Sequence, residues 1–256
     1  MLSRNTLLLT ILLAFVAGSC GDKTGKGDLA IQFLATYDGA PLVMLQEYPY
    51  NDTLDILFQK FNFYISNLTL LEEGSEKERE VLEIDFVEFD AIDDVAKAAL
   101  GFVVLMEDLP AHSYKGLNLG LGVPAGLNAT QESDYPDSHP LGKASHYWSG
   151  WGSYIFTMIN GKVDSDGDGQ FDDSSVLYHT GSDDSYRTKE IAHQFRVEEG
   201  ETTTIVLEVD LHKLFLDTDG VHYIDIIANP ATHDITNKTI TNLVMDNFQN
   251  ALYVVE

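Results

Sequence analysis

Apolar residues recur at every second position through much of this chain, and this period of two restricts the fold more than any other feature. Leu29, Ile31, Phe33, Ala35 and Tyr37 alternate with other residues, which is typical of a β-strand buried on one face. Similar patterns predict further strands at residues 57–71, 81–90, 117–123, 154–158, 205–211 and 223–227. The sequence therefore favours an all-β protein.

The stretch 57–71 contains a change of phase. Phe61, Phe63 and Ile65 share one face of the expected strand, whereas Leu68 and Leu70 fall on the other. One extra residue in a strand inverts the orientation of every later side chain, so this shift predicts a bulge or bend.

Three segments depart from the period of two and predict short helices. An acidic pair, Asp93 and Asp94, precedes residues 95–100 as helix caps do, and residues 211–216 fit one helical turn. Near the C-terminus, residues 243–251 carry apolar side chains at helical spacing. We predict a single β-sandwich domain of the immunoglobulin-like or Greek-key type over residues 29–256, with a few short helices, one near the C-terminus. A division into two domains is the alternative.

The composition excludes several classes of function. With 44% hydrophobic residues the chain has enough apolar side chains for a core, which argues against disorder. Its formal net charge of −26 would repel a nucleic acid, and no basic stripe is present to neutralise phosphates. Strong acidity instead fits an exported protein or one that binds cations.

The first residues resemble a bacterial lipoprotein signal peptide. Arg4 supplies a positive charge, residues 7–16 form an apolar run too short to span a membrane, and small residues lead to Cys20. We expect residues 1–19 to be removed, Cys20 to carry the lipid that anchors the protein, and residues 20–28 to form a tether. The predicted location is the cell envelope, on a periplasmic or surface-facing side of the outer membrane. Because Cys20 is the only cysteine, the mature domain has no disulfide and no thiolate ligand.

The densest group of carboxylates predicts a calcium site. Asp164, Asp166 and Asp168 occupy positions 1, 3 and 5 of a loop with glycine at position 6, which is the spacing of calcium-binding loops. The remaining candidate ligands are Gln170 through its carbonyl, Asp172, and Asp173, the last in place of the usual glutamate. A strand pattern precedes this loop, so it is not a helix–loop–helix EF-hand. A solvated acidic hairpin tip is the plain alternative.

Residues 139–181 also contain both tryptophans, Trp148 and Trp151, and three of the eight histidines. Aromatic packing in a core is the ordinary explanation of such a segment. The order in which several short motifs occur also indicates a family resemblance. The segments that carry the comparison are FYISNL at 63–68, LNLGLG at 117–122, the Trp148–Trp151 region followed by Asn160-Gly161, HTG at 179–181, LHKLF at 211–215 and MDNFQNA at 245–251.

Together, in this order, these segments resemble the MbnP-like copper-binding proteins, a family named for its methanobactin-operon member. The resemblance covers residues 29–254. It implies an exported β-sandwich, often a lipoprotein, of which some members bind one copper ion through histidines and a tryptophan oxidised to kynurenine. It also implies a di-haem peroxidase-type enzyme that performs this oxidation, and an outer-membrane transporter, as partners.

Carried over by position, the resemblance makes Trp148 or Trp151 the modified residue and offers four histidines as copper ligands. The candidates are His112, His139, His146 and His179. The chain departs from the copper-binding members in having no histidine between residues 21 and 111, where a ligand from an early strand is expected. Imidazole suits copper, zinc and nickel, and binds them in its neutral form. The other histidines are interpreted as surface or core residues: His193, His212, His222 and His233.

Two other classes of function remain open at this point. A calcium-stabilised surface module would bind a glycan or a protein through exposed Tyr147, Trp148 and Trp151. A hydrolase would need a catalytic motif, and the sequence contains no nucleophile elbow, no HExxH pair and no Walker loop. We therefore expect a binding protein and not an enzyme.

Overall fold

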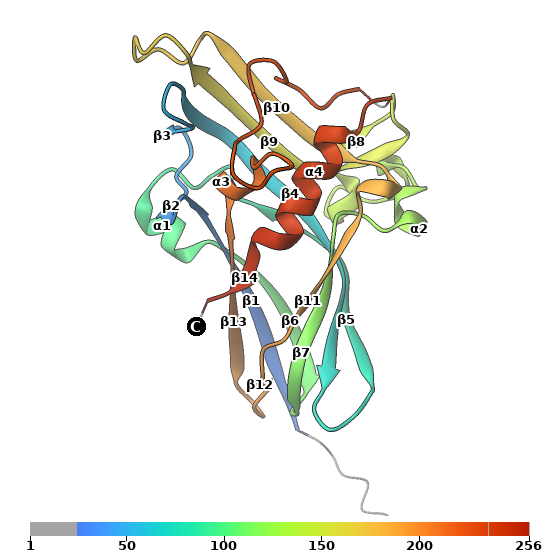
Figure 1. Ribbon diagram of the computed structural model, residues 1–256. Helices are drawn as coiled ribbons and strands as arrows, with labels where there is room; N and C mark the ends of the chain where they lie inside the picture. The colour runs from blue at the N-terminus through green and yellow to red at the C-terminus, as the bar shows by residue number, and fades with distance from the viewer. Residues whose placement is uncertain (1–24, 235, 256) are drawn as a thin grey trace, which may run out of the picture.

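The computed structural model describes residues 25–234 and 236–255 (Figure 1). The predicted signal peptide and Cys20 lie outside the described residues. In the described part of the chain, no helix combines the length and the hydropathy that a membrane crossing requires.

Two sheets form the sandwich. In the smaller sheet, β1 pairs in parallel with β13 and antiparallel with β2 and β6, and β14 extends the sheet beyond β13. Its strands are β1 (Lys26–Tyr37), β2 (Ala40–Pro41), β6 (Phe102–Pro110), β13 (Thr202–Asp210) and β14 (Leu252–Val254). Because β1 already includes residues 26–28, the predicted tether is corrected at its C-terminal end.

The larger sheet is built around one long strand, β4 (Asp55–Glu72), which runs along most of the molecule (Figure 1). Its first half pairs with β9 and β3, and its second half with β7 and β5. The other strands are β3 (Glu47–Pro49), β5 (Glu78–Glu88), β7 (Ser113–Leu121), β8 (Tyr147–Trp148), β9 (Ser153–Asp164), β10 (Ser174–Gly181), β11 (Arg187–Ile191) and β12 (Phe195–Arg196).

The predicted phase change in β4 is a bulge. The register with β7 shifts between Ser66 and Thr69, and Asn67 between them has a φ of 47°. Leu68 and Leu70 are therefore buried in the same core as Phe63, and not on the opposite face.

Short helices lie where the sequence predicts them. Asp94 caps α1 by accepting a hydrogen bond from the amide of Lys97. The α-helices are α1 (Val95–Leu100), α2 (Ala125–Asn128), α3 (Leu211–Leu214) and α4 (Thr239–Ala251), and the 3-10 helices are η1 (Glu132–Asp134), η2 (Pro140–Gly142), η3 (Ala144–His146) and η4 (Asp183–Ser185). The predicted all-β sandwich with one helix near the C-terminus is thus confirmed.

The strand predicted at residues 223–227 is wrong. Tyr223 makes only an isolated bridge to Leu216, and the chain then turns because the carboxylate of Asp225 accepts from the amides of Ile227 and Ala228. This local hydrogen bonding competes with strand pairing, and alternation of apolar residues does not reveal it.

Aromatic side chains fill the core between β4 and α4. Phe248 of α4 meets Phe63 of β4 edge to face at 4.8 Å, and Phe63 also contacts Phe33 of β1 at 5.8 Å. These contacts join the two sheets and the helix in one apolar cluster. The same helix contacts the inner face of β9 and β10, where Met245 accepts from the hydroxyls of Thr157 and Thr180.

We predict that Phe248→Ala lowers the free energy of unfolding by about 3–5 kcal/mol, because it leaves a cavity at the centre of this cluster. Urea denaturation would measure the loss. As a control, Val221→Ala removes an exposed side chain and should change stability by less than about 0.5 kcal/mol. Equal losses in the two variants would contradict the central role of α4.

Candidate metal centre

The outer face of β9 and β10 carries the candidate site. Thr157 and Thr180 point inward to α4, so their neighbours in the strands point to the opposite face. His179 is one of these neighbours. Its backbone amide donates to the hydroxyl of Thr232 at 2.8 Å, and this hydroxyl donates to the carbonyl of His179. Segment 229–233 is thereby fixed along β10.

This segment brings a second histidine to the first. Nε2 of His233 lies 3.0 Å from Nδ1 of His179, and the two ring centres are 4.6 Å apart. The sequence interprets His233 as a surface or core residue, and the structure places it, half-buried, against His179. The two histidines are 54 positions apart in the chain, and hydrogen bonds of Pro230 and Thr232 to β10 bring them together.

Asn160 of β9 fixes the orientation of His179. The side-chain oxygen of Asn160 lies 2.8 Å from Nε2 of His179, and an amide oxygen only accepts. The proton of the neutral ring is therefore on Nε2, and Nδ1 presents its lone pair toward His233. A hydrogen bond of this kind on the far nitrogen is how proteins orient metal-binding imidazoles.

Burial favours the neutral form of both rings. Desolvation, with smaller contributions from His233 and Lys60, lowers the pKa of His179 to about 4. Desolvation also lowers the pKa of His233. Neutral imidazoles are the form that binds transition metals. In this structure Nε2 of His233 donates to Nδ1 of His179, so an ion shared by the two rings would replace this hydrogen bond.

Trp148 lies against this pair, and Trp151 lies against Trp148. Trp148 meets the ring of His233 edge to face at 4.7 Å and stacks on Trp151 at 4.6 Å. Gly181 makes room for Trp151, because a Cβ at Gly181 would lie 3.0 Å from the indole ring.

His146 lies close to this centre but has a different role. Nε2 of His146 donates to the side-chain oxygen of Asn62 at 2.8 Å, and the amide nitrogen of Asn62 donates to Asp90. Its other ring nitrogen is paired with the hydroxyl of Ser145 at 2.9 Å. Both nitrogens are therefore engaged, and His146 joins η3 to β4.

The structure separates the other two candidate histidines from the pair. His139 stacks on Tyr135, and its Nδ1 accepts from the amide of Leu141 at the start of η2. His112 packs against Tyr114, which pairs with the far end of β4. Tyr114 pairs with Glu72 of β4, whereas His179 lies in the same row across the sheet as Asn62 of β4. Ten residues of strand, on the order of 30 Å, separate Glu72 from Asn62.

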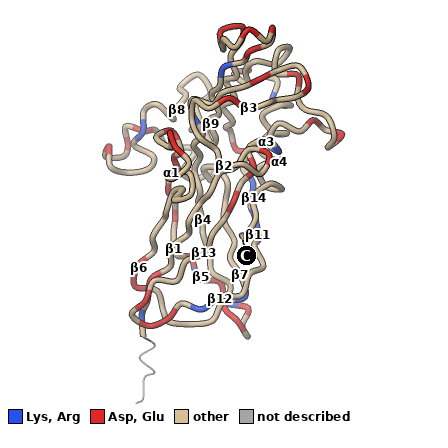
Figure 2. Tube along the Cα trace, turned by 90° about the vertical axis from the view of Figure 1, so that its left-hand side faces the viewer, with Lys and Arg blue, Asp and Glu red and all other residues tan. Residues whose placement is uncertain are grey.

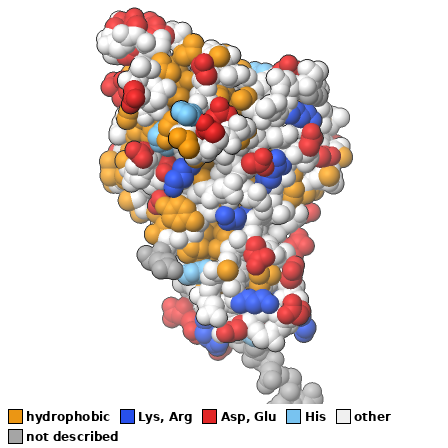
Figure 3. Space-filling model, in the orientation of Figure 1, with side chains coloured by type: hydrophobic (Ala, Val, Ile, Leu, Met, Phe, Trp, Pro, Cys, Tyr) orange, Lys and Arg blue, Asp and Glu red, His pale blue; other side chains and the backbone are white. Residues whose placement is uncertain are grey.

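The predicted calcium loop joins β9 to β10 at one end of the molecule, where acidic side chains gather (Figures 2 and 3). Asp164, Asp166 and Asp173 offer oxygen atoms that all lie within 4.8 Å of one another, and Asp164 is buried. Asp168 and Gln170 instead bond to each other, and Asp172 is outside the cluster. Three of the six predicted ligands therefore converge.

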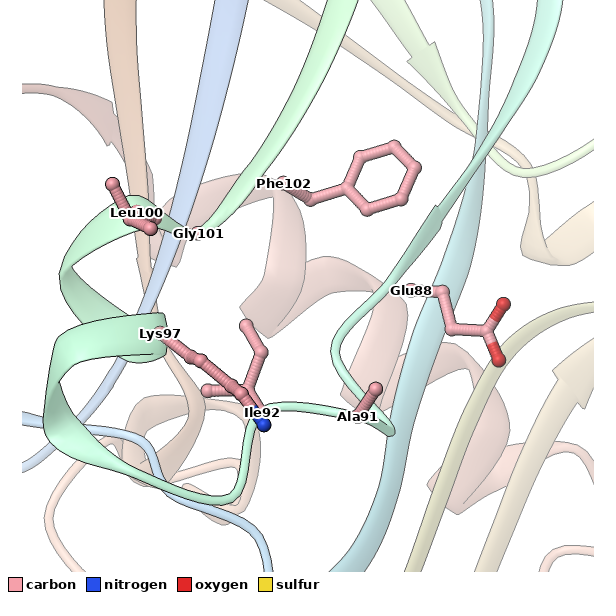
Figure 4. Close-up of a pocket in the computed structure, with 7 residues that line it drawn as sticks. All are labelled: Glu88, Ala91, Ile92, Lys97, Leu100, Gly101 and Phe102. Carbon is pink, nitrogen blue, oxygen red and sulfur yellow. The ribbon is translucent and has the colours of Figure 1, made fainter.

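A cavity of about 460 Å³ lies elsewhere, between α1 and the end of β5 (Figure 4). Residues that line it include Glu88, Lys97 and Phe102. The ammonium group of Lys97 is paired with Asp93, and no predicted site residue reaches the cavity. It holds no set of converging polar groups.

The fold is an all-β sandwich, and the histidine pair on its outer face is a candidate site for a transition-metal ion. The chain belongs to the MbnP family, whose sequence pattern it matches over residues 26–239. This match relates it to copper-associated proteins of methanobactin operons. Comparisons with curated proteins and with solved structures found no significant match.

The burial of His146 predicts a pH dependence of stability. Desolvation, followed by the nearby lysines Lys143 and Lys60, lowers the pKa of His146 to about 4, from about 6.5 in the unfolded chain. As the pH falls, the unfolded state thus binds a proton at a higher pH than the folded state does. The contribution of the neutral ring of His146 to the free energy of unfolding is therefore complete above about pH 6.5 and is lost toward about pH 4.

We expect wild type to lose about 3 kcal/mol of unfolding free energy relative to His146→Gln between pH 7 and pH 4. Urea denaturation of both proteins across this range provides the measurement. The buried carboxyl groups Asp85 and Asp90 are present in both proteins, so their titration cancels in the difference. A difference that does not change with pH would contradict the neutral, buried state of His146.

Proposed function

We propose that this protein is an exported lipoprotein that binds a copper ion through His179 and His233 and passes it to a partner. The observation that carries the proposal is the 3.0 Å approach of two ring nitrogens, on rings whose neutral form is favoured by burial. Membership of a copper-related family selects copper among the metals that imidazole binds.

The proposal gives each neighbour of the pair a role. Asn160 holds the proton of His179 on the nitrogen that faces away from the ion. Trp148 and Trp151 shield the pair from water, and Trp148 is the indole that contacts a ligand histidine. This contact favours Trp148 over Trp151 as the residue that a haem-containing partner would oxidise.

The remaining parts of the proposal concern the cell envelope. Cys20 would carry the lipid anchor after removal of residues 1–19, and the domain would then lie at a membrane of the cell envelope, which we propose is the outer membrane. An outer-membrane transporter would exchange copper with it. The proposed activity is binding and hand-over of the ion.

Copper titration against a chromophoric Cu(I) chelator tests the site. We expect a single copper ion per chain in wild type, loss of tight binding in His179→Asn and His233→Asn, and an affinity about 10- to 100-fold lower in Asn160→Leu. His112→Asn is the matched control, since its ring lies far from the pair, and should bind as wild type does. Copper retention by both His179→Asn and His233→Asn would refute the assignment.

We also propose that the loop between β9 and β10 binds Ca²⁺ through Asp164, Asp166 and Asp173. Three carboxylates held this close repel one another, and a divalent cation removes that repulsion. Its role would be structural, because the loop lies at the tip of the hairpin that carries His179.

Calcium at about 100 times its dissociation constant should add about 2.7 kcal/mol of stability to wild type. Asp164→Asn should abolish this gain, whereas Asp172→Asn, outside the cluster, should keep it. Denaturation with added calcium and with a chelator provides the comparison. Equal stability of wild type under the two conditions would exclude a calcium site in this loop.

A further inference from the structure

The row of side chains that contains His179 has a methionine at its centre. In the register of the larger sheet, Met158 of β9 is directly opposite both His179 of β10 and Asn62 of β4. Directly opposite residues on one face of a sheet have Cβ atoms about 5 Å apart. Met158 therefore lies beside the ring of His179, and on its other side is Asn62, which binds His146.

Met158 is buried at this position. Only 6% of its surface is exposed. Its neighbours along the outer row of β9 include the polar side chain of Asn160, which already binds His179. The other methionine near these strands, Met245, lies on the inner face and accepts from two threonine hydroxyls. In the described part of the chain, no such hydrogen bond occupies the sulfur of Met158.

Other candidates for a third ligand are engaged or distant. Both nitrogens of His146 are paired, with Asn62 and with Ser145. Among the described residues, no carboxylate joins His179 and His233 in a group able to hold an ion. The nearby carboxylate of Asp90 accepts from Asn62 and from the amide of Phe61.

We propose that the thioether of Met158 is a third ligand of the copper ion held by His179 and His233. This inference rests on the proposed function. Thioether sulfur is a soft ligand that favours Cu(I), whereas zinc gains little from it. A Met–His–His set thus separates Cu(I) from Zn²⁺ without any cysteine in the mature domain.

The test compares Met158→Leu with Met106→Leu in the full mature protein. Leucine keeps nearly the volume of methionine and removes only the sulfur. Met106 is a buried methionine of β6 in the smaller sheet, and it controls for the general effect of this exchange. Affinities for Cu(I) and Zn²⁺ would be measured by competition with chelators, and sulfur in the copper shell by X-ray absorption of the wild type.

We expect Met158→Leu to lower the Cu(I) affinity by about tenfold or more, to leave the Zn²⁺ affinity nearly unchanged, and Met106→Leu to alter neither. Wild type loaded with Cu(I) should show sulfur bound to the metal, a result that does not depend on any variant folding. Copper bound through nitrogen alone would overturn this inference but leave the proposed function intact. Failure of wild type to bind copper would overturn both.

Discussion

Strand β4 is buried on both faces, and this constraint organises the rest of the molecule. On its inner face Phe63 packs against α4 and the smaller sheet. On its outer face Asn62 is fully buried, so its polar atoms need partners, which Asp90 and His146 provide. An outer layer is therefore required over β4 and β9, and this layer includes η3 and Trp148 of β8.

The candidate metal centre results from that double burial. A sheet with one face in water would leave His179 solvated and free to protonate. Here the outer layer and segment 229–233 remove water from the ring, and Asn160 orients it. The neutral form of His179 is thus favoured by the segments that cover the ring, and not by the sequence of β10 alone.

The sequence predicted local features well and long-range ones poorly. Alternation placed β1 and β4, the phase change at residues 65–68 indicated the bulge, and the acidic pair before Val95 indicated α1, because each of these is determined by neighbours in the chain.

His179 was also found, through a short motif. His233 was not, because the hydrogen bonds of Thr232 to β10 that position it have no signature in sequence. The same limit explains why His146 and His139 were predicted as ligands although they have other roles. The hydrogen-bond partner of His146, Asn62, is 84 residues away, and His139 caps a 3-10 helix.

The two proposed ligand histidines lie on segments that are far apart in the chain. Residues 180–232 pass through β11, β13 and α3 before returning to β10, so an ion shared by His179 and His233 would close a loop of 54 residues. Closing a long loop removes conformational entropy from the unfolded chain, as a disulfide does. In a domain without disulfides, the cargo itself would act as a cross-link. Loaded and empty protein would then differ in resistance to unfolding and proteolysis, which gives a partner in the envelope a physical basis for telling them apart.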